Sequence, residues 1–160
     1  MYLLLISFAS CKVNYSFTGA SISPDIKTIN IKLFNKTSAL GPTTLPQIFT
    51  EKLKDKFTSQ TSLGFVTQNA DLTLEGTISG YVVTPLAIQQ NEQAARNRLT
   101  ITVNVKFTNV KDEKQNFESP FSRYADFDSK VNISSVEEAL IAEINTQLVD
   151  DIFNKAVINW

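Results

Sequence analysis

The sequence predicts an α+β fold, a two-layer sandwich in which two helices pack on one face of a mostly antiparallel sheet of four to five strands. Long segments alternate apolar and polar residues with a period of two, which is typical of strands that bury one face. Two other segments repeat apolar residues at helical spacing, so each carries one apolar stripe. A sheet with one apolar face needs cover on that face alone, and two such helices supply it.

The predicted strands are one short segment, over residues 29–33, and three long ones, over residues 72–82, 99–107 and 117–127. In the second strand the apolar side is expected to hold Leu72, Leu74, Gly76, Ile78, Gly80 and Val82. The glycines on that side would let another element approach the backbone closely. Pro120 has no amide donor, which indicates an edge strand or a bulge for the last strand.

The connections between the long strands are polar. Residues 111–114 form a charged turn, so the last two strands are expected to make a hairpin. Residues 85–98 read either as a polar loop or as the extended tip of a hairpin.

The predicted helices cover residues 44–60 and 135–159. Pro46 suits the first turn of the first helix, whose apolar stripe comprises Leu45, Ile48, Phe49, Leu53 and Phe57. Ser134 with Glu137, or Ser135 with Glu138, offers a capping box for the second helix. Its stripe comprises Val136, Leu140, Ile144, Leu148, Ile152, Ala156 and Trp160, joined by Ala139, Phe153 and Val157.

The composition excludes most enzymatic chemistry. The chain has no histidine and one cysteine, so His-dependent hydrolase triads and multi-cysteine sites are ruled out. Adjacent acidic residues such as Asp150 and Asp151 are better explained as helix caps or solvated faces than as acid–base pairs, since neighbouring helical positions diverge. We therefore expect no enzyme, no catalytic residue, no metal site and no cofactor. A net charge of −1 also argues against nucleic-acid binding.

The single cysteine, Cys11, follows a short apolar stretch that ends in Ala9 and Ser10. This arrangement resembles a bacterial lipoprotein signal, which is cleaved before the cysteine that then receives lipid. Residues 1–10 would then be a signal peptide and residues 11–160 a single domain. The alternative is a buried apolar strand with an incidental thiol. The stretch is too short to span a bilayer, which takes about 20 apolar residues.

Four basic residues lie on the predicted sheet: Arg96, Arg98, Lys106 and Arg123. If they cluster, they could bind phosphates or carboxylates. The alternative is ordinary surface charge.

Five segments taken together, in their order and spacing, resemble the LptE family of outer-membrane lipoproteins of lipopolysaccharide assembly, in its Bacteroidota branch. They are Tyr15–Ser23, Phe49–Phe57, Leu74–Tyr81, Asn97–Val103 and Asp151–Val157. The resemblance implies a sheet with two helices on one face. It also implies a non-enzymatic partner of a large LptD-type β-barrel translocon, which it plugs and helps to assemble.

The resemblance further implies lipid attachment at Cys11, an outer-membrane location facing the periplasm and a role in delivering lipopolysaccharide. The four basic residues then become candidate lipopolysaccharide contacts. An alternative function from another class is a free-standing periplasmic lipoprotein that binds a lipid or solute in a pocket between sheet and helices.

Overall fold

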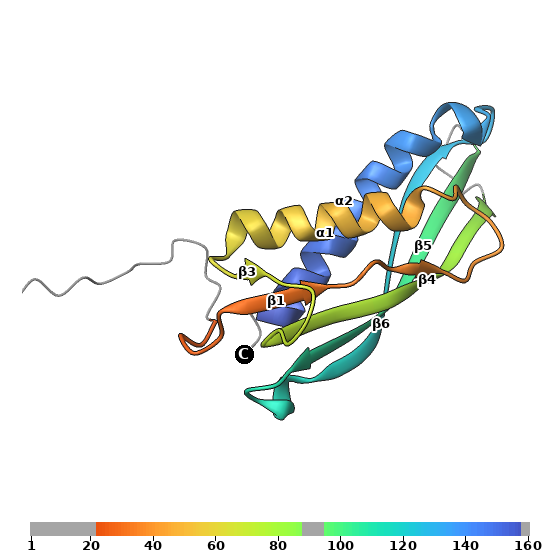
Figure 1. The fold of residues 1–160 in the computed structure, drawn as a ribbon. Helices are drawn as coiled ribbons and strands as arrows, with labels where there is room; N and C mark the ends of the chain where they lie inside the picture. Colours follow the sequence, from red (N-terminus) through yellow and green to blue (C-terminus); the bar gives the residue numbers. More distant parts are fainter. Residues whose placement is uncertain (1–21, 88–94, 158–160) are drawn as a thin grey trace, which may run out of the picture.

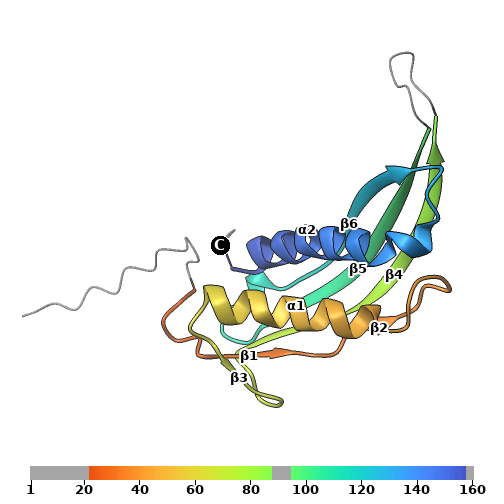
Figure 2. The same cartoon turned by 90° about the horizontal axis from the view of Figure 1, so that it is seen from above.

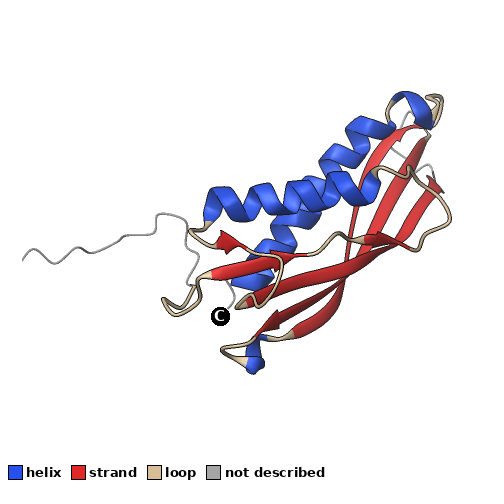
Figure 3. Cartoon of the chain, in the orientation of Figure 1, coloured by secondary structure: helices blue, strands red, loops and turns tan. Residues whose placement is uncertain are grey.

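A computed structural model describes residues 22–87 and 95–157, so the predictions for Cys11 and Trp160 lie outside the described residues. The described elements, in chain order, are β1 (Thr28–Ile31), β2 (Asn35–Lys36), α1 (Leu45–Gln60), β3 (Gly64–Phe65), β4 (Leu72–Leu86), β5 (Arg96–Asn109), β6 (Phe117–Asp128) and α2 (Glu137–Val157). Short 3₁₀ turns, η1 (Glu113–Gln115) and η2 (Ile133–Ser135), precede β6 and α2. The α+β prediction is confirmed (Figure 3).

The described strands form one six-stranded sheet in the order β3-β1-β4-β5-β6, and β2 pairs with β4 beyond the end of β1. The three long strands are antiparallel neighbours, whereas β1, β2 and β3 make parallel pairs. The strand count exceeds the predicted four to five because β2 and β3 have two residues each. Segments that short leave no alternation to read.

Both helices lie on one face of the sheet, and the opposite face is left uncovered (Figures 1 and 2). The core fills the layer between them, and its largest fully buried side chains include Phe34, Phe49, Phe57, Phe107 and Phe153. An edge-to-face contact at 5.0 Å joins Phe57 of α1 to Phe153 of α2. Neither of the two described helices is long and apolar enough to cross a membrane.

The first helix is tied to the sheet through Thr50. Its hydroxyl donates to the Pro46 carbonyl at 2.7 Å and accepts from the Phe34 amide at 3.1 Å. Phe34 also packs edge-to-face on Phe49, with 5.0 Å between the ring centroids. The strand predicted over residues 29–33 is shorter in the structure, because β1 ends at Ile31; Phe34 is then buried, whereas Leu33 is 62% exposed.

Gly76 is required by this packing. A Cβ there would lie 2.2 Å from the Asn104 carbonyl oxygen and 2.6 Å from the Phe34 ring. The predicted close approach is confirmed at this position, where any side chain would force the backbone or the ring to move.

A β-bulge in β4 overturns the predicted alternation beyond residue 78. Ile78 pairs with Val103 and Gly80 pairs with Thr102, so Ser79 is an extra residue without a counterpart on β5. Tyr81 therefore turns inward and is buried, while Val82, predicted to be buried, lies on the uncovered face and is 50% exposed. The sequence pattern continues without a break here, so nothing in it marks the bulge.

The helices begin and pack slightly differently from the prediction. The predicted capping boxes do not form at α2, because the Asn132 side chain accepts from the Ser134 amide in η2 and the Glu137 carboxylate accepts from the Tyr81 hydroxyl. Ile48 of the predicted α1 stripe is 44% exposed. Conversely, α2 buries three residues beyond its predicted stripe because both the sheet and α1 cover it: Ile141, Asn145 and Val149.

Candidate functional site: the open face of the sheet

The open face, by which we mean the face of the sheet opposite the helices, carries the even-numbered residues of β5 and β6. The odd-numbered residues of β5, from Leu99 to Phe107, are buried under the helices. Their neighbours Thr100, Thr102 and Asn104 lie on the other side of the pleat. A sheet face rich in threonine and asparagine can contact solvent or a polar partner.

The strand register divides this face into two halves. At the end where β4 finishes and β5 begins, Val82, Thr100 and Tyr124 form one row across three strands. The next rows are Thr84–Arg98–Asp126 and Leu86–Arg96–Asp128. We call the residues Val82, Leu86, Arg96, Arg98 and Tyr124 the hairpin patch. It combines exposed apolar side chains with two guanidinium groups.

Arg98 is held rigidly within the hairpin patch. Its Nε and Nη2 atoms donate to the two carboxylate oxygens of Asp126 at 2.7 and 2.9 Å, a two-pronged ion pair. Its guanidinium carbon lies 3.5 Å from the centroid of the Tyr124 ring. The hydrogen bonds from Arg98 hold the pKa of the Asp126 carboxyl below its ordinary value. This guanidinium is therefore neutralised locally and presented flat on an aromatic ring.

Arg96 is the less constrained member of the patch. It is exposed, and among the described residues no carboxylate lies within ion-pair distance of it. It sits one row beyond Arg98, opposite Leu86 on β4. Arg96 thus carries the positive charge of the patch that is not held in a salt bridge among the described residues, although it lies opposite Asp128 and its charge also lowers the pKa of Asp126.

Lys106 lies on the other half of the open face, away from the hairpin patch. Glu75 binds two lysines there, with Nζ–Oε distances of 2.6 Å to Lys32 and 3.6 Å to Lys106. The hydrogen bond from Lys32 and the nearby Lys106 lower the pKa of the Glu75 carboxyl. A shallow hollow of about 300 Å³ beside these residues is also bordered by Asn104 and Glu118.

Arg123 lies on the opposite face of the sheet from the other three basic residues. It is in register with Ile101, whose side chain is buried under the helices. Its guanidinium donates to both carboxylate oxygens of Asp151 on α2, at 2.5 and 2.7 Å. The four basic candidates therefore do not form one cluster: Arg96 and Arg98 are together, whereas Lys106 and Arg123 lie elsewhere.

Three acidic residues of the described fold are held in ion pairs. Asp150 pairs with Lys56 at 2.8 Å, Asp151 pairs with Arg123, and Asp126 pairs with Arg98. Within residues 22–87 and 95–157, no group of three or more metal-ligating side chains comes together. Asp150 and Asp151 are each held by a basic side chain of a different element, Lys56 of α1 and Arg123 of β6.

The layer between sheet and helices is packed with side chains, which argues against a lipid pocket in that position. Two hollows on the described surface lie between α1 and α2, with volumes of about 700 and 580 Å³. Ile48 borders both, and most of the other lining residues are charged or polar. The alternative of an internal lipid or solute site thus receives no support from the core.

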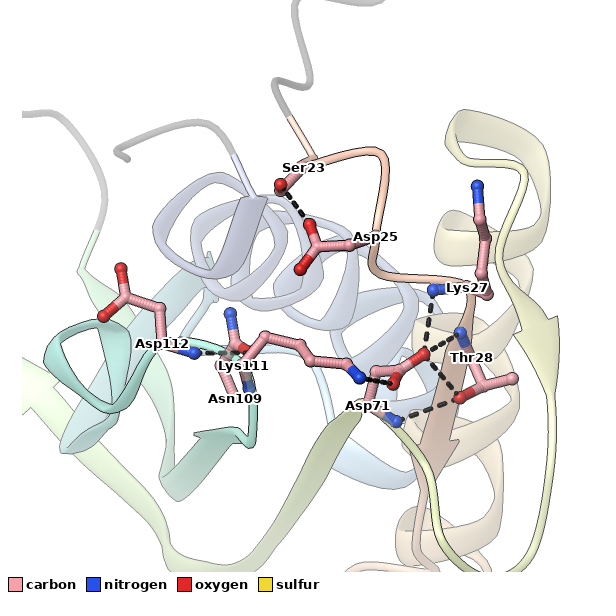
Figure 4. Close-up of polar contacts among 8 residues, drawn as sticks. All are labelled: Ser23, Asp25, Lys27, Thr28, Asp71, Asn109, Lys111 and Asp112. Atoms are coloured by element: carbon pink, nitrogen blue, oxygen red, sulfur yellow. Dashed lines mark hydrogen bonds and ion pairs between the residues drawn. The ribbon is translucent and has the colours of Figure 1, made fainter.

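At the opposite end of the sheet from the hairpin patch, polar groups fasten the chain where the described part begins (Figure 4). One carboxylate oxygen of Asp71 accepts from the Lys27 amide at 2.9 Å and from the Thr28 amide and hydroxyl at 3.0 and 2.9 Å. The Lys111 ammonium lies 3.5 Å from the other oxygen. The hydrogen bonds from Lys27 and Thr28 are the main reason why the pKa of Asp71 falls to about 2. Asp71 therefore joins β1, β4 and the β5–β6 turn.

Sequence reasoning missed Tyr124 and Asp71. The sequence could have placed Tyr124 and Asp126 on one face of the sheet. They are two residues apart in a strand, where neighbouring side chains such as Arg123 point to the opposite face. Asp71 gave no such signal, since its partners lie more than 40 positions away in the chain.

Comparisons with known proteins agree with this architecture. The rare lipoprotein B of Shewanella oneidensis superposes with a TM-score of 0.53 at 15% identity, covering 80% of this chain and 92% of that one. A minor lipoprotein of Acinetobacter baumannii gives 0.52 at 13% identity, covering 81% and 91%. Lipoprotein B of Nitrosomonas europaea gives 0.52 at 13%, covering 80% of each chain. At these identities the likeness shows a shared fold.

A search of curated protein sequences returns no match. The family model described as "LptE: Lipopolysaccharide-assembly", in contrast, matches residues 26–156, which is most of the chain and nearly all of the described fold. On that match, with which the fold agrees, the chain belongs to the LptE lipopolysaccharide-assembly family.

Proposed function

We propose that this protein is the lipid-anchored, non-enzymatic subunit of an outer-membrane complex that assembles and exports lipopolysaccharide. The observation that carries the proposal is the family match over residues 26–156. Its family comprises outer-membrane lipoproteins of lipopolysaccharide assembly, which are not enzymes. The occupied carboxylates and the absence of histidine from the sequence fit a binding role.

The proposed partner is an LptD-type β-barrel that this domain plugs and helps to assemble. The test is recovery of a tagged chain from detergent-solubilised outer membranes of its own host, with the bound proteins identified by mass spectrometry. We expect one large outer-membrane barrel protein at a fixed ratio to the chain. Repeated recovery of the tagged chain alone would refute the partnership.

The proposed anchor is lipid on Cys11, with residues 1–10 removed as a signal and the domain facing the periplasm. Cys11 precedes Ile22, the first described residue, by 11 positions, so the connecting chain reaches at most about 40 Å. The described chain begins at the end of the sheet opposite the hairpin patch (Figure 2). A lipid at Cys11 would thus leave the hairpin patch free to point away from the bilayer.

Intact-mass measurement of the mature chain tests cleavage and acylation together. We expect a mass that starts at Cys11 and includes three acyl chains, which anchor stably where one would not. Cys11→Ala should keep the near-native circular dichroism and leave the membrane fraction after detergent-free washing of a host that lacks the barrel partner. Retention of the alanine variant there would overturn the anchor.

Lipopolysaccharide is the proposed ligand of the hairpin patch, because it presents both phosphates and acyl chains and the patch presents guanidinium and apolar groups. Arg96→Gln removes the unpaired charge without stranding a carboxylate, and Lys114→Gln, an exposed lysine in the β5–β6 turn, is the matched control. We expect the first variant to bind purified lipopolysaccharide about two- to fivefold more weakly, as for one exposed ion pair. Equal binding by both variants would remove the patch from the proposal.

A further inference from the structure

The sheet ends in two unlike edges. At one edge β3 has two residues, too few to accept another strand. At the other edge β6 has 12 residues and pairs with β5 on one side only. Natural proteins blunt long edges with proline, charge or a bulge, because unpaired backbone groups invite another strand. How much of β6 is blunted therefore decides whether it can bind a partner.

The direction of the backbone groups along β6 follows from three observations. The Ser129 amide donates to the Ala95 carbonyl, so odd-numbered residues of this strand point toward β5. Each residue of a strand directs its N–H and C=O to the same side, and neighbours alternate. The Val110 amide donates to the Asp71 carbonyl next to β4. Even-numbered residues of β5 therefore direct their backbone groups toward β4, and odd-numbered residues direct theirs toward β6. Pro120, which has no N–H, lies at an even position, where no ladder bond to β5 is lost.

Even-numbered residues of β6 therefore turn their backbone groups to the free edge. Pro120 blunts the beginning of this edge, and the Asp128 carbonyl is used at its end by the Val131 amide. Between them, Ser122, Tyr124 and Asp126 each present one donor and one acceptor. Three consecutive outward residues provide six backbone hydrogen bonds, enough for a strand of about five to seven residues.

The charges near this edge select its occupant. Glu118 is exposed and has no ion-pair partner among the described residues, and the Asp128 carboxylate accepts a hydrogen bond from the Lys130 backbone amide. The positive charge on β6, Arg123, is already neutralised by Asp151. The edge is thus flanked by two carboxylates that make no salt bridge among the described residues and lie opposite Lys106 and Arg96 of β5. A second copy paired through Ser122 and Tyr124 would set Glu118 of one copy against Asp128 of the other, a repulsive arrangement.

We propose that the β6 edge from Ser122 to Asp126 is a docking site for an extended segment of the barrel partner that carries basic residues near its ends. The inference rests on the proposed barrel partnership and names a contact within it. Binding adds a strand beside β6, and the new side chains on the open face lie next to Tyr124 of the hairpin patch. The partner strand would therefore form one wall of the lipopolysaccharide site.

Proline at position 122 is the sharpest test, because it deletes an outward donor and leaves the ladder with β5 intact. Ser122→Ala is the matched control, since both variants lose the 3.0 Å contact with the Thr102 hydroxyl. We expect Ser122→Pro to recover about five- to tenfold less barrel protein than Ser122→Ala, as for one or more lost hydrogen bonds. Glu118→Lys should also lower recovery, by reversing one of the selecting charges.

Amide hydrogen exchange keeps the proposal testable if Ser122→Pro unfolds. In the isolated wild-type domain, the amides of Ser122, Tyr124 and Asp126 should exchange quickly and those of Phe121, Arg123 and Ala125 slowly. In the recovered complex the first three should slow by about tenfold or more.

If wild type recovers no barrel protein, the proposed partnership fails and this inference fails with it. If wild type recovers the barrel but the three amides stay fast in the complex, the strand-docking inference alone is overturned.

Discussion

The two ends of the sheet are built on opposite principles. At the N-terminal end of the domain, where the described chain begins, Asp71 and Asn109 saturate backbone groups from several segments. At the hairpin end, β4 and β5 run on past the bulge and leave Val82 and Tyr124 half exposed. One end satisfies its polar groups internally, and the other leaves apolar and cationic groups at the surface.

The difference separates residues that hold the fold from residues available to a partner. Asn109 is fully buried and its amide oxygen accepts from two backbone amides of the β5–β6 turn, so its loss would be felt throughout the sheet. Tyr124 is 49% exposed and contacts Arg98, so its loss would be felt mainly by whatever binds there. Substitutions near Asn109 should therefore lower stability more than binding, and substitutions near Tyr124 should lower binding more than stability.

The largest expected effect on stability is at Asn109. Asn109→Ala removes the side chain that donates to Gln115 at 2.6 Å and strands the amides of Lys111 and Asp112. We expect a loss of about 2–3 kcal/mol in the free energy of unfolding, measured by urea denaturation. Asn104→Ala, on the open face of the same strand, should change it by less than about 0.5 kcal/mol. Equal effects at both positions would contradict the contrast.

A smaller, pH-dependent effect is expected at Asp71, whose carboxylate is partly open to solvent. Its folded pKa of about 2 is below the ordinary value of 3.8, so the stabilisation is complete above pH 4 and is lost as pH falls toward 2. Thermal unfolding between pH 5 and pH 2 should show a steeper loss for wild type than for Asp71→Asn. Parallel pH profiles would mean that the folded state does not stabilise the charged form of Asp71.

At Tyr124 we expect a larger effect on binding than on stability. Tyr124→Ala removes the ring beneath the Arg98 guanidinium, and we expect it to weaken lipopolysaccharide binding about fivefold while costing less stability than Asn109→Ala. Binding assays on the purified domain, paired with urea denaturation, measure both quantities. Tyr124→Phe is the control, since it keeps the stacking and should bind like wild type. A large stability loss with unchanged binding would reverse the assignment of the two ends.

The smallest effect is expected midway between the ends, at Lys106. Its ammonium lies 3.6 Å from the Glu75 carboxylate, and the two side chains are exposed and half-buried, respectively. Lys106→Gln should change the free energy of unfolding by no more than about 0.5 kcal/mol, and less in high salt. A larger change would show that the ion pairs of the open face hold β1 and β5 to β4.

Much of the fold could be predicted because the alternation of apolar and polar residues runs over long, continuous segments of the sequence. The stretches around Leu99, Phe117 and Leu140 each repeat over ten or more residues, so period and element type are unambiguous. The missing amide of Pro120 indicated either an edge position or a bulge for β6, and the strand order shows the edge position. The family resemblance was confirmed by the match over residues 26–156.

The site was less predictable because it depends on pairing between strands. Arg98 and Asp126 are 28 positions apart, and only the β5–β6 register brings them together. Arg123 could have been assigned to the helix-covered face from its alternation with Phe121 and Ala125, yet its charge favoured grouping it with the other basic residues. The exposed side of Val82 could not have been found, because a bulge changes one pairing and leaves the composition unchanged.

That bulge shifts the register of β4 against β5 by one residue. One unpaired residue, Ser79, exchanges the faces of everything that follows it on β4, so that Tyr81 joins the interior and Val82 joins the hairpin patch. If Ser79 instead took a partner on β5 and the pairing ran without a bulge, Tyr81 would lie on the open face, and Val82 and Leu86 would leave the hairpin patch for the helix-covered side. One inserted residue, which is not itself a member of the hairpin patch, thus decides which side chains β4 contributes to that patch.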